Sequence, residues 1–338
     1  MRKELISKLL NVPFISILLK YDYYIKCTLV SKHKMPIMKE VIVTSNDQII
    51  IHSNKGIELY DLNNIQKSIG FFEGSRHVTH IKLIPNNRII TYNGRYFQVW
   101  NIDTLKIEHQ IVDNYWGYMI DICIVSDNTI AIYEVNKNDI KVWHFEKEPI
   151  ILKGHLEPVI HVLPFKDKLL SASDDDTLKI WNLNTGKSEF RLQGHEHAIT
   201  DVNIMENLIL SSSVDKSIRI WNSSGICKGI IETTDTVKKI LVYENRIITI
   251  NSHDKDIRVW NIESICEATL TGHKYDIDDI QLLPNNDIIS SSLVNNELRI
   301  WDISTYRCIN TWNINYKNFI VHNQKLIVYD THNISIWH

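Results

Sequence analysis

The chain has 338 residues, enough for one large domain or two ordinary ones, and its 37 basic and 40 acidic residues leave a net charge of −3. Because the charges are interspersed and nearly balanced, the chain has no strong positive potential that would attract nucleic-acid backbones or anionic membranes. The 44% hydrophobic content argues against disorder. The chain is rich in Ile but contains only four Ala, a composition that disfavours a mainly helical fold.

The first 21 residues form an N-terminal extension in which the pattern predicts a short helix. Asn11 is a suitable N-cap, Pro13 falls in the first turn, and Phe14, Ile17 and Leu18 recur at helical spacing. The apolar run around them is too short to span a bilayer, and its charged approach disfavours a secretion signal. The five Cys lie at least 39 residues apart, which favours reduced thiols and a cytoplasmic protein, with the nucleus as the alternative.

One motif recurs eight times along the rest of the chain. Each copy alternates apolar and polar residues around an aromatic residue, which is the pattern of a half-buried strand. The aromatic positions follow one another at intervals of 36 to 43 residues. The copies are Ile57–Asp61, Phe97–Asn101, Ile140–His144, Leu178–Asn182, Ile218–Asn222, Ile257–Asn261, Leu298–Asp302 and Ile334–His338.

Two β-rich stretches precede each copy and another follows it, as at 159–163, 168–173 and 188–192 around Leu178–Asn182. One repeat therefore predicts four antiparallel strands, named a, b, c and d in chain order, with the motif as strand c. A unit of about 40 residues cannot bury both of its faces alone, so the copies must pack side by side. We predict an all-β, eight-bladed β-propeller; seven blades with one displaced copy is the alternative.

Over nearly its whole length the sequence resembles the WD-repeat family. Gly-His pairs precede strand a at Gly154-His155, Gly194-His195 and Gly272-His273, and Ser-x-Ser-x-Asp runs enter strand c at 171–175 and 211–215. Within a blade of this family, His, Ser, Asp and Trp can satisfy one another's buried polar groups, a structural and not a catalytic role. The expected sets are His155, Ser173, Asp175 and Trp181, with Ser171 as an alternative serine; His195, Ser213, Asp215 and Trp221; and His273, Ser291, Asn295 and Trp301.

The last repeat ends one residue after its aromatic position, which leaves blade 8 without a strand d from its own end of the chain. An unpaired sheet edge invites aggregation, so we expect an N-terminal strand to close the ring. Residues 23–30 are the candidate, because 28–34 aligns with 269–274 when one extra residue is allowed. The propeller domain then comprises residues 22–338.

Antiparallel order places every d–a loop and every b–c turn on one face of the ring, which we name the d–a/b–c face. One loop of this face carries Tyr115, Trp116 and Tyr118, and exposed aromatic residues suit binding hot spots. The alternative is that Trp116 folds down to cap a blade without a Gly-His pair. Further candidates for contact with a partner are Arg76, His77, Glu157, Asp174, His197, His253, Tyr275, Asp276, Tyr316 and His332.

These patterns predict a non-catalytic scaffold or adaptor that binds protein or peptide partners on the d–a/b–c face, with no cofactor, metal, nucleic acid or membrane. The sequence has no P-loop, GxSxG or HExxH motif. A second hypothesis is a substrate receptor of a ubiquitin ligase, because Pro13 to Lys34 resembles a shortened F-box. A third is a propeller enzyme that uses polar side chains at the inner ends of the a strands, around the central channel.

Overall fold

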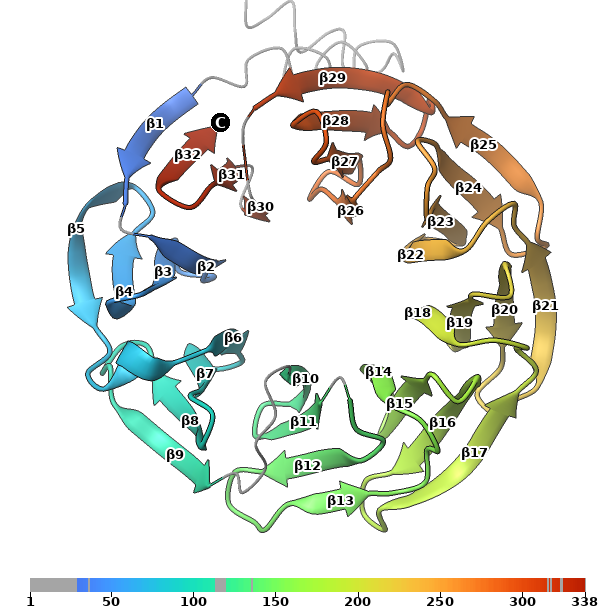
Figure 1. Cartoon of the computed structure of the whole chain (residues 1–338), viewed down its shortest axis with the longest axis horizontal. Coiled ribbons are helices and arrows are strands. Elements are labelled where there is room, and N and C mark those ends of the chain that lie inside the picture. The colour runs from blue at the N-terminus through green and yellow to red at the C-terminus, as the bar shows by residue number, and fades with distance from the viewer. Residues whose placement is uncertain are drawn as a thin grey trace, which may run out of the picture.

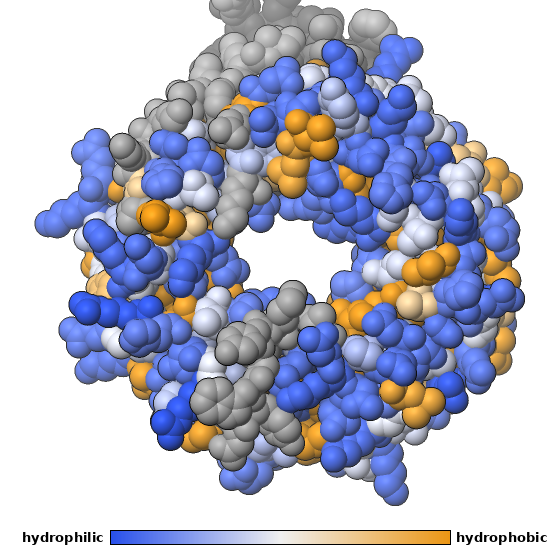
Figure 2. Space-filling view, viewed as in Figure 1, coloured by the Kyte–Doolittle hydropathy of each residue, from blue (hydrophilic) through white to orange (hydrophobic). Residues whose placement is uncertain are grey.

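The computed structural model describes residues 29–337 except 36, 113–119, 135, 315, 317 and 323–324. Its strands form eight four-stranded antiparallel sheets arranged in a ring (Figure 1), which confirms the eight-bladed propeller, and the space-filling view shows an open channel at the centre (Figure 2). The helix expected in the N-terminal extension lies outside the described residues. Among those described, no helix is long and apolar enough to span a membrane.

We number the blades in chain order, and the strands of each blade run from the channel to the rim as a, b, c and d. Blades 1 and 2 comprise β2 (Met38–Val43), β3 (Gln48–Ser53), β4 (Gly56–Asp61) and β5 (Asn64–Phe71), then β6 (His80–Ile84), β7 (Arg88–Tyr92), β8 (Tyr96–Asn101) and β9 (Ile107–Val112), with the 3-10 turn η1 (Ser75–His77) between them. Blades 3 and 4 comprise β10 (Ile120–Ser126), β11 (Thr129–Glu134), β12 (Ile140–His144) and β13 (Ile150–Leu152), then β14 (Val159–Phe165), β15 (Lys168–Ser173), β16 (Thr177–Asn182) and β17 (Lys187–Gln193).

Blades 5 and 6 comprise β18 (Ile199–Met205), β19 (Leu208–Ser213), β20 (Ser217–Trp221) and β21 (Cys227–Glu232), then β22 (Val237–Tyr243), β23 (Arg246–Asn251), β24 (Ile257–Asn261) and β25 (Cys266–Leu270). Blade 7 comprises β26 (Asp279–Leu282), β27 (Ile288–Ser292), β28 (Glu297–Asp302) and β29 (Arg307–Asn313). Blade 8 comprises β30 (Asn318–His322), β31 (Lys325–Tyr329), β32 (Asn333–Trp337) and, as its outer strand, β1 (Leu29–Lys34).

The apolar core is divided into eight layers, one between each pair of neighbouring blades. Trp181 of blade 4, for example, packs with Ile140 and Val142 of blade 3. In the seven blades whose strand-c aromatic side chain is described, that residue lies in the layer facing the preceding blade. Because the ring's centre is open, each blade depends on its two neighbours for burial.

An N-terminal strand closes the ring, as predicted, but the bounds predicted for it need correction. β1 pairs antiparallel with β32, from Leu29 opposite Trp337 to Lys34 opposite Asn333. Of the predicted span 23–30, residues 29 and 30 belong to this strand, and 23–28 lie outside the described residues. The alignment of 28–34 with 269–274 makes His33 equivalent to His273 and so predicts it in a d–a loop. In the structure His33 instead pairs with Ile334 of β32 and is part of the sheet.

The register predicts different outcomes for two N-terminal deletions. A chain that lacks residues 1–28 keeps β1 and its pairing with β32. A chain that lacks residues 1–34 leaves the edge of β32 unpaired, so it should unfold at a lower temperature and self-associate. Calorimetry and size-exclusion chromatography measure both effects, and equal unfolding temperatures for the two deletions would contradict this account of closure.

Candidate binding face

Two buried polar sets hold the d–a loops of blades 4 and 5 against their own sheets. His155 Nδ1 lies 2.8 Å from Asp175 Oδ2, its Nε2 lies 2.7 Å from Ser171 Oγ, and Trp181 Nε1 donates to the same Ser171 oxygen at 2.7 Å. The same arrangement in blade 5 joins His195, Asp215, Ser211 and Trp221. Since these groups bond to one another out of solvent, they fix loop geometry and offer no reactive side chain to a ligand.

In blade 4 the set contains the alternative serine, Ser171, and not Ser173, and in blade 5 Ser211 takes the place of the expected Ser213. Leu169 pairs with Trp181, so Ser171, two residues further along the same sheet face, is the diagonal neighbour that reaches the indole. Ser173 lies another two residues away, a distance of about 7 Å along the strand. It donates to Glu157 O at 2.9 Å and accepts the Asp175 N–H at 3.1 Å, and Ser213 bonds His197 O in the same way.

In blade 7 the expected Ser291 is replaced by its neighbour Ser290. Ile288 pairs with Trp301, which places Ser290 on the face of the indole and Ser291 on the opposite face. Ser290 Oγ accepts from Trp301 Nε1 at 2.7 Å and lies 2.6 Å from His273 Nε2. The b–c turn of this blade differs in length from that of blade 4, so counting from the turn gives the wrong residue.

In blade 7 the residue that faces His273 Nδ1, where blades 4 and 5 have Asp, is Glu297 and not the expected Asn295. Glu297 Oε1 lies 3.5 Å from His273 Nδ1, and the expected Asn295 bonds this carboxylate through its amide at 2.5 Å. Burial lowers the pKa of His273 to about 4 although Glu297 acts in the opposite direction. His273 is therefore neutral at pH 7.

Two blades contain the indole–hydroxyl bond without the rest of the set, and sequence reasoning missed both. Trp100 Nε1 donates to Thr91 Oγ1 at 2.9 Å, and Trp260 Nε1 donates to Thr249 Oγ1 at 3.0 Å. The hydroxyl always stands two residues after the partner of the Trp in strand b, 9 to 11 residues before the Trp in sequence. Counting back 9 to 11 residues from the Trp selects a single hydroxyl residue for Thr91, Ser171 and Thr249, but it leaves two adjacent serines as candidates in blade 5 and three in blade 7.

Most of the predicted contact residues are exposed in d–a loops or b–c turns: Arg76, His77, Glu157, Asp174, His197, His253, Tyr275, Asp276 and His332. Tyr316 requires correction, because only 5% of it is exposed. It packs against Phe319, and its hydroxyl donates to Glu297 O at 3.4 Å. The predicted contacts of Tyr115, Trp116 and Tyr118 lie outside the described residues.

An apolar patch on this face was not predicted. Tyr275, Leu293 and Val294 are 49%, 46% and 69% exposed, and we name them the blade-7 patch. The first lies in the d–a loop of blade 7 and the other two in its b–c turn, and the bond from Leu293 N–H to Asp278 Oδ2, 2.6 Å long, joins the two segments. Figure 2 shows apolar surface over this blade. The signal in the sequence is the Leu-Val pair where blade 4 has two Asp.

Eight residues occupy one equivalent position near the start of the innermost strands: Glu40, His80, Asp121, His161, Asp201, Lys239, Asp279 and Asn318. Several of these polar groups connect neighbouring blades. Lys239 Nζ lies 2.5 Å from Asp279 Oδ1, and His161 Nε2 lies 3.6 Å from Asp201 Oδ1. Asp201 Oδ2 also accepts the Ile240 N–H of the next blade at 2.6 Å. The polar groups that the enzyme hypothesis requires are therefore present, but these contacts engage four of the eight in holding blades together.

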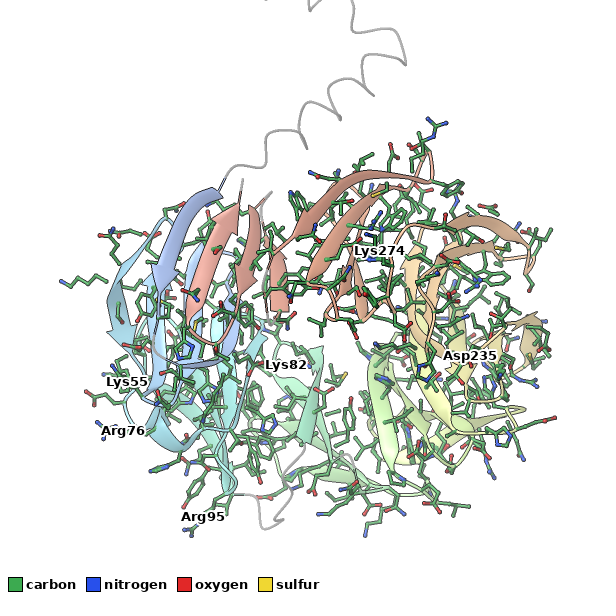
Figure 3. All side chains as sticks on the ribbon, turned by 45° about the horizontal axis from the view of Figure 1, so that its top comes forward. Lys55, Arg76, Lys82, Arg95, Asp235 and Lys274 are labelled. Atoms are coloured by element: carbon green, nitrogen blue, oxygen red, sulfur yellow. The ribbon has the colours of Figure 1, made fainter. Side chains whose placement is uncertain are left out.

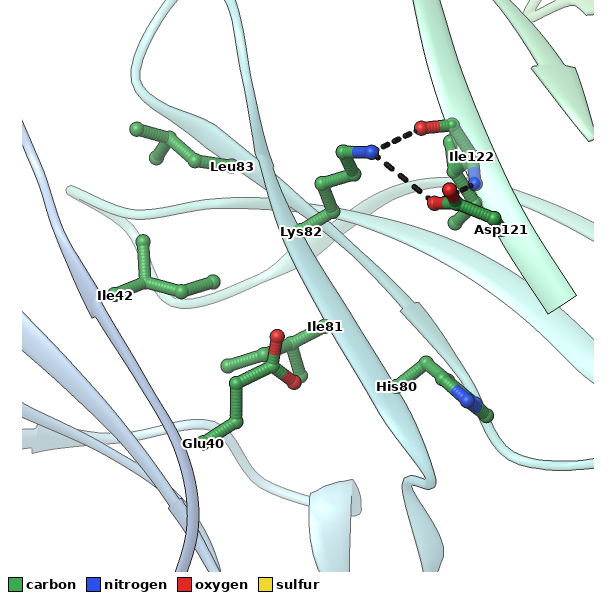
Figure 4. A pocket seen from close by; sticks show the side chains of 8 residues that line it. All are labelled: Glu40, Ile42, His80, Ile81, Lys82, Leu83, Asp121 and Ile122. Carbon is green, nitrogen blue, oxygen red and sulfur yellow. Dashed lines mark hydrogen bonds and ion pairs between the residues drawn. The ribbon is translucent and has the colours of Figure 1, made fainter. Parts of the chain in front are cut away.

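A recess of about 420 Å³ opens beside β6 in the channel wall (Figure 4). It is lined by Glu40, Ile42, His80, Ile81, Lys82, Leu83, Asp121 and Ile122. Lys82 Nζ bonds Asp121 Oδ1 at 3.2 Å and also donates to Ile122 O. Among the described residues that line this recess, none is Ser, Thr or Cys. Within the described ranges, no three His, Cys, Asp or Glu side chains are grouped to bind a metal ion.

Buried histidines predict that acid destabilises the fold. Burial, and then the charge of Lys39, lowers the pKa of His52 to about 4, and that of His273 is similarly low. In the unfolded chain a histidine has a pKa of about 6.5. Between about pH 6.5 and 4 the unfolded chain therefore binds more protons than the folded protein, and the free energy of unfolding falls as the pH is lowered. The urea midpoint should therefore be lower at pH 5 than at pH 7.5, and a His52→Gln/His273→Gln variant should lose less over this range. An equal loss in both proteins would refute the assignment.

Adjacent serines in β27 provide a matched test of the buried set. Ser290→Ala leaves the buried Trp301 N–H and His273 without their shared oxygen, so it should reduce the free energy of unfolding by about 1–3 kcal/mol. Ser291→Ala removes a hydroxyl that bonds Asp279 O at 3.4 Å and also bonds the Tyr316 hydroxyl, which has a second acceptor in Glu297 O, so it should cost less. Chemical denaturation of both variants makes the comparison. A larger loss for Ser291→Ala would contradict the geometry.

Comparison with known proteins supports the same architecture. The family model described as WD domain, G-beta repeat matches residues 147–182, 186–222 and 264–302. The crystal structure of the computationally designed Ika8 protein is similar with a TM-score of 0.75 and 18% identity, over 93% of this chain and 99% of that one. The WD40 β-propeller domain of Doa1 gives 0.57 and 19%, over 78% of this chain and 92% of that domain.

No curated protein matches the sequence significantly. At 18% and 19% identity, the two solved structures support the fold and nothing further. Together with the three matched repeats and the eight sheets, they lead to one conclusion. The chain carries WD40 repeats in an eight-bladed propeller, a fold that generally serves as a protein-interaction scaffold.

Proposed function

We propose that the protein is a non-catalytic scaffold or adaptor that binds partner proteins or peptides on its d–a/b–c face. The observation that carries this proposal is the blade-7 patch, an aromatic and two aliphatic side chains exposed side by side on loops. Large side chains without a packing role are costly to leave in water, and clusters of them are typical of binding sites.

The surroundings of the blade-7 patch also suit a protein partner. Lys274, Asp276 and His253 are exposed next to it, and His253 Nδ1 lies 3.7 Å from Asp276 Oδ2. An apolar centre with a mixed-charge rim is the usual anatomy of a protein–protein interface. The exposed candidates Arg76, His77, Glu157, Asp174 and His197 extend this face around the ring, and the aromatic residues at 115, 116 and 118 stay predicted contacts.

The two other hypotheses have weaker support. In the ubiquitin-ligase hypothesis, the last six residues of the F-box-like segment are those of β1, whose backbone is bonded to β32 and thus committed to blade 8. In the enzyme hypothesis, the channel wall supplies space and polar groups, but Lys82 and Asp121 are already bonded to each other. We place the scaffold in the cytoplasm or nucleus, since Cys123, Cys227, Cys266 and Cys308 are unpaired thiols.

Affinity capture tests the proposal by comparing two sets of exposed apolar residues. A Tyr275→Ser/Leu293→Ser/Val294→Ser variant should lose partners that wild type retains from a cell extract, because the apolar centre of the interface is gone. The matched control is Ile226→Ser/Ile265→Ser, which removes side chains that are 56% and 60% exposed on the opposite face. The proposal fails if both variants retain the wild-type partners, or if only the control loses them.

A further inference from the structure

Loops of blades 1 and 2 bring three exposed cations to one sector of the d–a/b–c face. Lys55 lies in the b–c turn of blade 1, Arg76 lies in η1, and Arg95 lies in the b–c turn of blade 2. All three are exposed, and Figure 3 shows them on the same side of the ring with their side chains directed outward. We name these three residues the basic patch.

Backbone and side-chain bonds hold these loops together. Buried Ser75 Oγ, next to Arg76, accepts the N–H of Ile57 at 2.8 Å, two residues after Lys55. On the other side of η1, the Thr79 N–H donates to Tyr92 O at 2.8 Å, just before the turn that carries Arg95. The three cations therefore stand on segments that are already ordered, which reduces the entropy lost when a ligand binds.

The three cations of the basic patch have no acidic partner among the described residues, whereas two other cations of this face are paired. Lys216 lies 3.7 Å from Asp235, and Arg258 lies 2.5 Å from Asp254. Across the described residues, no carboxylate forms an ion pair with the basic patch, and the contact given for it is Arg95 over the Tyr96 ring at 5.1 Å. Its charge is thus available to a ligand.

Another sector of the same face is acidic. Glu157, Asp174 and Asp176 gather on the d–a loop and b–c turn of blade 4. Burial, and then the charges of the neighbouring carboxylates, raises the pKa of Asp174. A nucleic acid laid across the whole face would meet this repulsive sector, whereas a short segment confined to blades 1 and 2 would not.

We propose that the basic patch docks an extended acidic segment of a partner protein, with carboxylates spaced along it. Guanidinium groups bind carboxylates through paired hydrogen bonds, and Lys55 adds a point charge. Because the cations stand on three separate loops, they match several spaced charges better than one phosphate group. This inference rests on the proposed function, since it names the chemistry of one partner on the same face.

Fluorescence anisotropy tests the inference with a labelled twelve-residue peptide of alternating Glu and Gly. Wild-type protein should bind it, and binding should weaken between low and high salt, because exposed charges are screened. The Lys55→Gln/Arg76→Gln/Arg95→Gln variant should bind about threefold to one-hundredfold more weakly, which corresponds to the loss of three exposed ion pairs of about 0.2–1 kcal/mol each. The matched control, Lys106→Gln/Lys147→Gln/Lys187→Gln, removes the same charge from exposed positions on the opposite face and should bind within about twofold of wild type.

Three further probes decide between occupants: the same peptide with Gln for Glu, a Gln-Gly peptide with one phosphoserine, and a twelve-nucleotide oligouridine. The inference is overturned if the basic-patch variant binds like wild type, or if any of the three probes binds as well as the Glu peptide. It is also overturned if sedimentation shows that the patch binds a second copy of this chain. Failure here, with partner loss in the blade-7 variant, would leave the proposed function standing.

Discussion

Each blade of this protein has two apolar faces and too few residues to cover either one. Both faces of each blade are buried in apolar layers shared with the two neighbouring blades. All eight layers can form only if the ring is closed, so the stability of each blade depends on closure. The ring is closed by the backbone hydrogen bonds between β1 and β32. These are the only neighbouring strands of a sheet that come from opposite ends of the described chain. The rigidity of the loop-bearing face depends on the same closure.

Given that ring, the polar sets determine how firmly each loop is held. In blades 4 and 5, His, Ser, Asp and Trp fix the d–a loop from within the blade. The d–a loop of blade 2 lacks a Gly-His pair and is held from blade 1, where buried His52 Nε2 lies 2.9 Å from Val78 O. The candidate binding residues Arg76 and His77 thus stand on a loop that the repeat pattern does not describe.

Strand periodicity made most of the fold predictable, since the spacing of Tyr60 and the repeated Trp residues gives eight c strands. Strand periodicity could not predict which residues of neighbouring strands pair, because that depends on the exact register and on the length of each turn. Ser290 and Ser291 are both plausible until the partner of Trp301 is known, and His33 appears equivalent to a loop histidine until β1 is paired. Tyr316 was misplaced for a related reason: a loop position on the binding face can still point into the layer between blades 7 and 8.

The net charge of −3 conceals how the charges are distributed on the binding face. Lys55, Arg76 and Arg95 occupy one sector, the carboxylates of blade 4 another, and the blade-7 patch a third. Because the sectors lie on different blades of one closed ring, their separation is fixed by the inter-blade layers and not by flexible loops. Ligands of different chemistry could then occupy separate sectors without competing, and a partner that contacts two sectors would gain effective concentration from the rigid spacing. Such an arrangement favours a scaffold over a site for a single ligand.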